Sequence, residues 1–252
     1  MPNNHNPVNP ALLATVAAKA ADVVALLRAA VKDHAPVVFA NSLGAEDMLL
    51  TDLIWRQQLP IEIFALDTGR LPAETYALIA TAEKHYGQRI QLVFPHPTDV
   101  EACVSRYGIN GFYDSIEARK ACCHARKVEP LQRMLANKGA WVTGLRAAQA
   151  ATRTGVAPLA PDEANGLIKV SPLANWSEEE VWAYIHAHNV PYNALHDQGY
   201  PSIGCAPCTR AIQPGEDIRA GRWWWENPQT KECGLHMVDG RLQRILKEGT
   251  SS

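Results

Sequence analysis

Six cysteines are the side chains of this 252-residue sequence whose types and spacing most clearly point to chemistry. Two of them form the pair Cys205-Ala-Pro-Cys208, in a stretch where Gly and Pro disfavour a regular helix or strand. A second pair, Cys122-Cys123, occurs earlier in the chain. Two thiol pairs predict a metal or cluster site, and their spacing alone does not choose between zinc and iron–sulfur. A redox-active pair or two buried thiols are the alternative interpretations of the C-x-x-C motif.

The two remaining cysteines stand apart from these pairs. Cys103 lies in an ordinary amphipathic segment and is interpreted as structural. Cys233 stands alone near the C-terminus. In a reducing compartment such a set of thiols indicates ligands and catalytic groups rather than disulfides.

Composition restricts the binding partners and the location. The 24 basic and 26 acidic residues give a formal net charge of −2, so no excess of basic charge for nucleic acid is present. Any bound anion must therefore be met by locally placed cations. The polar residues 1–10 lack the features of a signal peptide, and charge interrupts the apolar runs before the length of a membrane span. The sequence predicts a soluble cytoplasmic protein that does not enter a membrane.

The elements that must position these groups follow a strand–turn–helix pattern. After a helix over 11–32, the apolar run 36–40 predicts a buried strand, and small residues lead from it into a helix that ends near Gln57. Residues 61–66 repeat the pattern, with a helix beginning near Pro72. Such turns expose backbone N–H groups that bind phosphate, although a plain strand-to-helix turn is the alternative. Further strands are predicted at 91–94, 141–143 and 168–172.

These elements predict a doubly wound, mostly parallel α/β sheet whose strand ends form one crevice. Neither the dinucleotide-binding nor the Walker fingerprint is present. The predicted organisation is a disordered tail at 1–10 and a single domain at 11–246, with a mobile C-terminal segment at 223–252 that carries Cys233.

Three features of the second half bear on the site. The helical stretch 115–137 should bend near Cys122, because adjacent side chains on a regular helix diverge by about 100°. Arg146 and Arg153 lie in a loop beyond a strand end, where they bind an anion or simply remain in solvent. Residues Trp223-Trp224-Trp225 cannot all face inward, so at least one should contact a ligand, a partner or another subunit.

In its motifs the sequence resembles the assimilatory adenylyl-sulfate (APS) reductases, the thioredoxin-dependent iron–sulfur branch of the phosphoadenylyl-sulfate (PAPS) reductase family. The resemblance covers residues 36–236. The motifs that carry it are Ser42-x-Gly44-Ala45-Glu46-Asp47, Leu66-Asp67-Thr68-Gly69-Arg70, Cys122-Cys123-x-x-Arg126-Lys127, Thr143-Gly144-x-Arg146, Cys205-x-x-Cys208 and Lys231-Glu232-Cys233-Gly234-Leu235-His236.

The resemblance implies an adenine-nucleotide α-hydrolase-like fold and reduction of APS to sulfite and AMP, in sulfate assimilation and cysteine biosynthesis. It implies a [4Fe-4S] cluster held by Cys122, Cys123, Cys205 and Cys208. The implied catalytic residues are Cys233, His236 and Lys127. The implied substrate-binding residues are Ser42, Gly44, Asp47, Leu66, Thr68, Gly144, Arg146, Arg153, Arg219 and Arg222.

Under this resemblance Cys233 attacks the sulfate sulfur, AMP leaves, and an S-sulfocysteine forms that thioredoxin or a glutaredoxin-like dithiol resolves. A thiolate approaching two anionic groups needs nearby cations, which would also lower the pKa of its thiol. We expect the Lys127 ammonium to bridge the cluster and the sulfate. The sequence departs from the family at Leu43 and Ala150, where a hydroxyl is often found.

Three other functions compete with this one. A PAPS reductase or a dual-specificity enzyme would also accept a 3′-phosphate on the substrate. An ATP-dependent adenylating enzyme of the same fold, such as a sulfate adenylyltransferase small subunit, would lack the cysteine set and the Cys233 motif. A non-catalytic iron–sulfur or zinc protein that binds nucleotide would not need Cys233. The tryptophan run and the N-terminal helix could serve a homo-oligomer interface.

Overall fold

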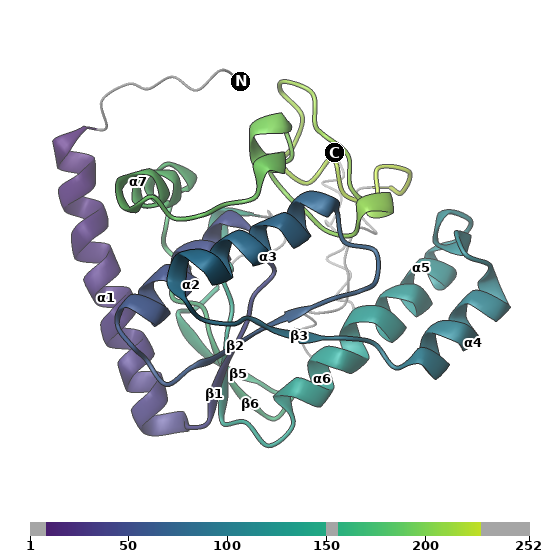
Figure 1. Ribbon diagram of the computed structural model, residues 1–252, viewed down its shortest axis with the longest axis horizontal. Helices are drawn as coiled ribbons and strands as arrows, with labels where there is room; N and C mark the ends of the chain where they lie inside the picture. Colours follow the sequence, from purple (N-terminus) through teal and green to yellow (C-terminus); the bar gives the residue numbers. More distant parts are fainter. Residues whose placement is uncertain (1–8, 150–155, 228–252) are drawn as a thin grey trace, which may run out of the picture.

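A six-stranded sheet, in the order β3-β2-β1-β4-β6-β5, is the centre of the computed structural model, which describes residues 9–149 and 156–227 (Figure 1). All neighbouring strands pair in parallel except β5, which is antiparallel to β6. The strands are β1 (Val37–Ala40), β2 (Glu62–Leu66), β3 (Gln91–Val93), β4 (Ala140–Val142), β5 (Leu159–Asp162) and β6 (Leu167–Val170). The predicted doubly wound, mostly parallel α/β fold is confirmed.

Helices cover both faces of this sheet, because the short central strands are apolar on both sides. In β1, Val37 and Phe39 belong to one hydrophobic core, and Val38 points to the other with Leu131 and Leu135. The first core is covered by α1 (Pro10–His34), α2 (Ala45–Arg56), α3 (Ala73–Tyr86) and α7 (Glu178–His188). The second core lies under α6 (Glu129–Leu135), which follows α4 (Pro97–Tyr107) and α5 (Ile116–Cys123).

The order of the strands creates a crevice at their carboxyl ends. The chain runs from β1 outward through β2 to β3, and then returns so that β4 pairs with the other side of β1. The loops that leave β1 and β4 therefore diverge, which is the position where open α/β sheets bind ligands. The turns that the sequence singled out, at 41–44, 67–70 and 143–146, all lie at this edge.

A buried carboxylate anchors α2, whose first turn faces the crevice. Asp52 is fully buried and accepts hydrogen bonds from the hydroxyls of Tyr86 on α3 and Tyr184 on α7, at 2.8 and 2.7 Å. Arg56 donates to the same carboxylate at 2.7 Å. Buried polar groups stabilise a fold when every lone pair is satisfied, so this network holds three helices in one arrangement.

The helical stretch that carries the first cysteine pair is irregular, as the sequence predicts. A π-helical turn, η2 (His124–Val128), begins directly after Cys123 and separates α5 from α6. Pro130, in the first turn of α6, has no N–H to continue the helical ladder, which accounts for the irregularity. The capping box at the start of α7 is also present, with Ser177 and Glu180 bonded to each other's backbone.

One strand was missed by the sequence pattern. Strand β5 was not predicted, because Pro161 interrupts it and its sequence does not read as an apolar run; it forms only as the antiparallel edge partner of β6. Within the described residues, α1 is long and apolar enough to cross a membrane by length and composition alone. Core helices pass the same test, and α1 packs on the first core through Val16, Val23 and Leu27.

Candidate functional site

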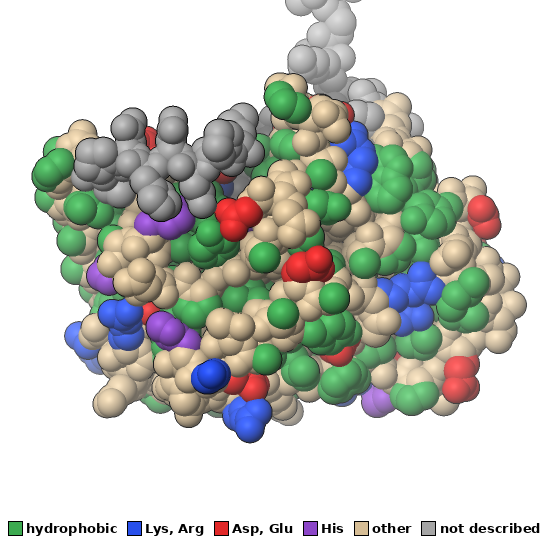
Figure 2. Space-filling view, turned by 45° about the horizontal axis from the view of Figure 1, so that its top comes forward, with side chains coloured by type: hydrophobic (Ala, Val, Ile, Leu, Met, Phe, Trp, Pro, Cys, Tyr) green, Lys and Arg blue, Asp and Glu red, His purple; other side chains and the backbone are tan. Residues whose placement is uncertain are grey.

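A cavity of about 1050 Å³ occupies the crevice at the carboxyl ends of the strands. Loops after β1, β2 and β4 form its base, and residues between 196 and 223 form its opposite wall. Ten of the residues predicted from the sequence line it: Ser42, Gly44, Asp47, Leu66, Thr68, Lys127, Gly144, Arg146, Arg219 and Arg222. On the face in Figure 2, Lys and Arg side chains form separate small groups and no continuous basic surface.

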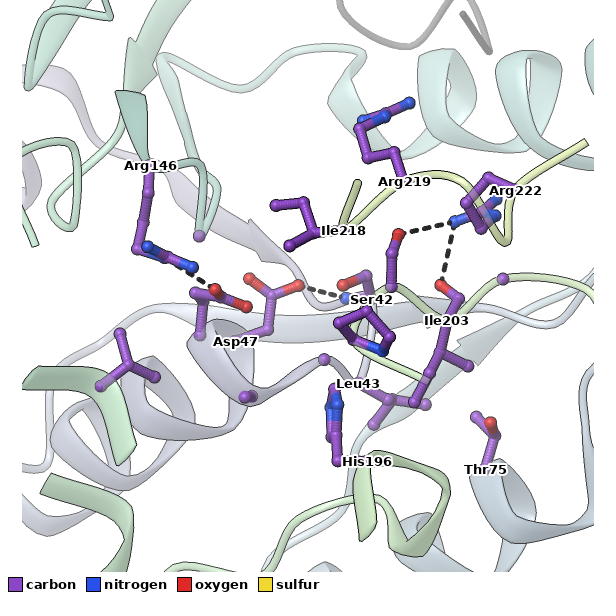
Figure 3. Close-up of a pocket in the computed structure, with 18 of the residues that line it drawn as sticks. Ser42, Leu43, Asp47, Thr75, Arg146, His196, Ile203, Ile218, Arg219 and Arg222 are labelled. Carbon is purple, nitrogen blue, oxygen red and sulfur yellow. Dashed lines mark hydrogen bonds and ion pairs between the residues drawn. The ribbon is translucent and has the colours of Figure 1, made fainter. Parts of the chain in front are cut away.

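The carboxylate of Asp47, in the first turn of α2, closes the turn after β1. The backbone N–H of Ser42 donates to Oδ2 of Asp47 at 2.6 Å (Figure 3). A Cβ at position 144 would collide with Oδ1 of Asp47, so the close approach of the β4 loop requires glycine there. Leu43, where the family often has a hydroxyl, is buried with a φ of 63° and packs in the first core. Burial raises the pKa of Asp47 to about 6, although Ser42 donates to it.

This raised pKa makes a testable prediction about stability. In the unfolded chain the Asp47 carboxyl has its ordinary pKa of 3.8, whereas in the folded state it keeps its proton up to a pH of about 6. The free energy of unfolding therefore falls as pH rises from about 4 to about 6. Replacing Asp47 with Asn should remove a penalty of about 3 kcal/mol at pH 7 and change little at pH 4. Thermal unfolding of both proteins at the two pH values measures this. A difference that does not grow with pH, or that the exposed control Asp33→Asn reproduces, would contradict it.

Arg146 lines the cavity but shares its charge with an acidic neighbour. Its Nε donates to Oε1 of Glu46 at 2.7 Å, and the Arg146 side chain is only 5% exposed. Arg146 comes from the loop after β4 and Glu46 from the first turn of α2, so the pair links the two loops at the topological switch point (Figure 3). Arg146, which the sequence predicted to bind an anion, is therefore held in a buried ion pair at the cavity wall.

Two further arginines approach from the opposite wall. Arg219 and Arg222 lie on the segment that follows the second cysteine pair, and both line the cavity (Figure 3). Nη1 of Arg222 lies 3.2 Å from the carbonyl oxygen of Ile203, and the guanidinium lies 4.9 Å from the ring centroid of Trp223. A Cβ at Gly204 would collide with this guanidinium, so glycine in the cysteine loop makes room for it. Packing therefore fixes the position of Arg222.

A second, smaller cavity brings the two cysteine pairs together. Cys122, Cys123, Cys205 and Cys208 all line it. The hydroxyl of Thr68 lies 3.2 Å from the Sγ atom of Cys205. Five basic side chains line the same cavity: Arg70, Arg119, Arg126, Lys127 and Arg222. This environment is suited to a group with net negative charge.

The two cavities share a wall. Lys127, Arg222 and Trp223 line both of them. Lys127 belongs to the π-helical turn that begins directly after Cys123, so the irregular turn is what carries its side chain to this boundary. A cation at the boundary can interact with charged groups on both sides of it.

The thiols differ in their electrostatic surroundings. Burial raises the pKa of Cys208 to about 12, with the neighbouring Cys205 and Cys123 adding to the effect. Burial also raises the pKa of Cys122. For Cys205 burial is outweighed by Lys127 and by the Thr68 hydroxyl, and its pKa is lowered. Within the described residues, no group of three or more His, Cys, Asp or Glu side chains is arranged to hold a metal ion.

Sequence reasoning missed several residues of the site. Arg119 and Glu226 form a buried ion pair at 2.6 Å that ties α5 to the end of the described chain. The ring of Trp223, from the tryptophan run that the sequence singled out, lies near both Arg119 and Arg222, with guanidinium-to-centroid distances of 4.8 and 4.9 Å. His196 lines the large cavity, its Nε2 atom is buried without a hydrogen-bond partner, and burial lowers its pKa. For Arg119, Glu226 and His196 the sequence carried no local signal of a role in the site.

Three predicted residues, Arg153, Cys233 and His236, lie outside the described residues, as does Ala150. The described chain ends at Asn227, six positions before Cys233. The segment expected to be mobile begins at Trp223, and its described part is packed through Trp223 and Glu226.

Comparisons with known proteins agree on a family. Residues 36–211 match the phosphoadenosine phosphosulfate reductase domain. An adenosine 5′-phosphosulfate reductase of Allochromatium vinosum is 61% identical over 222 residues, which are 88% of this chain and 87% of that protein. The enzyme of the same name from Burkholderia cepacia is 54% identical over 228 residues, or 90% and 91% of the two chains.

Solved structures share the fold. A phosphoadenylyl-sulfate reductase from Candida auris, in complex with phosphate, aligns with a TM-score of 0.65 and 27% identity, over 75% of this chain and 90% of that one. An FMN adenylyltransferase of Candida glabrata aligns with a TM-score of 0.55 over 90% and 81% of the chains. At 15% identity this second likeness concerns the fold alone.

Proposed function

The chain belongs to the phosphoadenosine phosphosulfate reductase family, and from this premise we propose that it reduces adenosine 5′-phosphosulfate to sulfite and AMP in assimilatory sulfate reduction. One observation carries the proposal most directly. The cavity at the strand ends and the cavity lined by four cysteines share Lys127, Arg222 and Trp223. An anionic nucleotide and an anionic cofactor would therefore meet at a boundary that contains two cations.

The shape and the charges of the large cavity suit this substrate. The adenosine would occupy the base formed by the strand ends, near Leu66 and Gly144. The phosphate and sulfate would extend toward Arg219 and Arg222 on the opposite wall. Because Asp47 and Glu46 already occupy the first turn of α2, the arginines rather than this turn supply the positive charge.

The four cysteines fit a [4Fe-4S] cluster, which would be held by Cys122, Cys123, Cys205 and Cys208. Cysteine thiolates are the ligands that hold such clusters, and all four thiols line one cavity. Their basic surroundings offset a net negative charge. When bound, the cluster would supply a fixed negative charge beside Lys127 and anchor the segments that carry the two cysteine pairs.

The chemistry itself would belong to Cys233. Its thiolate would form a bond to the sulfate sulfur while the bond from sulfur to the phosphate oxygen breaks, so that AMP leaves and S-sulfocysteine remains. Lys127, Arg219 and Arg222 would offset the repulsion between the thiolate and the substrate anions. His236, three residues beyond Cys233, would add a further donor.

A dithiol protein of the thioredoxin or glutaredoxin class would complete the cycle in the cytoplasm. Its first thiolate attacks the Cys233 sulfur and releases sulfite, which leaves a mixed disulfide. Its second thiolate attacks that disulfide, frees Cys233 and leaves the donor oxidised by two electrons. The sulfur of the sulfate group gains these two electrons and leaves as sulfite.

The proposal is tested by sulfite release from the purified protein with reduced thioredoxin and either APS or PAPS. We expect turnover with APS and a much lower kcat/KM with PAPS. Equal or faster turnover with PAPS would instead assign the chain to the PAPS-reducing members of the family. No sulfite from either nucleotide, with a small dithiol as well as with thioredoxin, would reject the proposed reaction.

Lys127 offers a sharper test of the shared boundary. Replacing it with Ala should lower kcat/KM for APS by roughly 10²–10³, as loss of a donor to developing charge does, while the iron content stays unchanged. Iron analysis and initial rates of sulfite release measure the two quantities. Lys120 is exposed on the same helical stretch, so Lys120→Ala is the matched control. Full activity in a Lys127→Ala protein that retains its iron would exclude a bridging role.

A further inference from the structure

The three consecutive tryptophans divide between the inside and the outside of the protein. Trp223 is 1% exposed and lies at the wall between the two cavities. Trp224, the next residue, is 40% exposed. The φ of 42° at Trp223 turns the chain sharply enough for adjacent indoles to point to opposite sides. The proposed reaction accounts for Trp223 but not for Trp224.

Trp224 belongs to a group of aromatic side chains that come from two distant parts of the chain. The Tyr113 ring lies 4.4 Å from the Trp225 ring and 6.2 Å from the Trp224 ring, centroid to centroid. Trp224 and Trp225 lie 4.8 Å apart. Tyr113 is 40% exposed, and none of the three lines either cavity. We call Tyr113, Trp224 and Trp225 the aromatic patch.

The surroundings of the patch are also apolar. Phe112 lies directly beneath it, with its ring 4.5 Å from that of Tyr113. Ile109 and Ile116, on either side of Tyr113 in sequence, are exposed. Exposed aromatic side chains gathered in one place are typical of protein interaction surfaces, where Trp and Tyr contribute most of the binding energy. The patch therefore fits a protein partner better than a small anionic substrate.

Two structural connections join the patch to the reacting groups. The Tyr113 hydroxyl donates to the carbonyl oxygen of Pro207, between the cysteines of the second pair, at 2.7 Å. Figure 1 shows the end of the described chain, in yellow-green, near the loop between α4 and α5 that carries Tyr113, and the ring contacts agree. Cys233 follows Asn227 by six residues, which span at most about 22 Å when fully extended.

We propose that the aromatic patch is the docking surface for the dithiol protein that reduces the enzyme. This inference rests on the proposed function. A protein dithiol must bring a thiolate into contact with the sulfur of Cys233, and the length of the chain keeps that sulfur within one protein diameter of Trp225. An apolar surface at this position would hold the donor through the two thiolate attacks.

The test compares a protein donor with a small one. Trp224→Ala should raise the KM for reduced thioredoxin about tenfold, as expected for loss of an exposed interface tryptophan, and leave kcat/KM with dithiothreitol unchanged. Trp224→Lys, which keeps a long side chain but adds charge, should have at least the same effect. Leu159→Ala is the matched control, because Leu159 is exposed to the same extent, 41%, on the edge strand β5.

Three outcomes with an active unsubstituted protein would overturn the docking surface. An unchanged KM for thioredoxin in both Trp224 variants would locate the donor elsewhere. An equal loss with both donors would assign Trp224 to the chemistry or to folding, and thermal unfolding would separate these two. A change in oligomeric state with an unchanged thioredoxin KM would assign the patch to a second copy of the chain. Failure of the unsubstituted protein with both donors would reject the proposed reaction instead.

Discussion

Replacement of Cys233 by serine is expected to lower sulfite release from APS by roughly 10⁴-fold or more, with iron content and thermal stability unchanged. A serine hydroxyl is a far weaker nucleophile than a thiolate, and it cannot form an S-sulfo intermediate that a dithiol resolves. Steady-state sulfite production with thioredoxin measures the loss. Mass spectrometry of the unsubstituted protein incubated with APS alone should detect one added SO₃ group on Cys233.

Cys103 provides the matched control for this prediction. It is a free, half-buried thiol on α4 and lines neither cavity. Cys103→Ser should retain activity within about twofold, because this thiol lines neither cavity and is not one of the proposed ligands. If Cys233→Ser retained substantial activity, or if the added group were found on another cysteine, the assignment of the nucleophile would be wrong.

Replacement of Cys208 by serine is expected to remove the iron from the protein. It should also remove at least 99% of the sulfite-releasing activity. In the proposed cluster the ligands come from segments far apart in sequence, so loss of one would release the loop of the second cysteine pair from the helical stretch that carries Lys127. Iron and sulfide content and the visible absorption spectrum measure the loss of the cofactor.

Thermal unfolding should show that the same substitution lowers stability, because a ligand that joins distant segments stabilises the folded state. Cys103→Ser again serves as the control, since it removes a thiol without removing a ligand. Zinc in place of iron in the unsubstituted protein would overturn the identity of the cofactor. Full iron content in Cys208→Ser would overturn its role as a ligand.

Much of the fold followed from local patterns in the sequence. The continuous apolar run around Val38 predicted a strand buried on both faces, and both hydrophobic cores meet at β1. The Ser177 capping box predicted the start of α7. Each of these signals depends on residues that are close in sequence, which is why the sequence alone was sufficient.

Local sequence patterns did not predict strand β5 or the ion pair of Arg146. Residues 159–162 have little strand character, and they pair because β6 presents an open edge to them. Arg146 was predicted as an anion-binding group, yet its charge is shared with Glu46, which lies 100 positions away. A long-range ion pair leaves no periodicity or motif at either partner, so only the folded chain reveals it.

The sequence by itself determined the chemical types at the site: two thiol pairs, a separate thiol at Cys233, and basic residues beside strand ends. The tertiary structure decided which of these groups meet. It brought the two cysteine pairs to one cavity, carried Lys127 to the boundary with a second, and turned Trp223 inward and Trp224 outward. The physical reason is that residue types are local properties, whereas proximity depends on how helices and loops pack around the whole sheet.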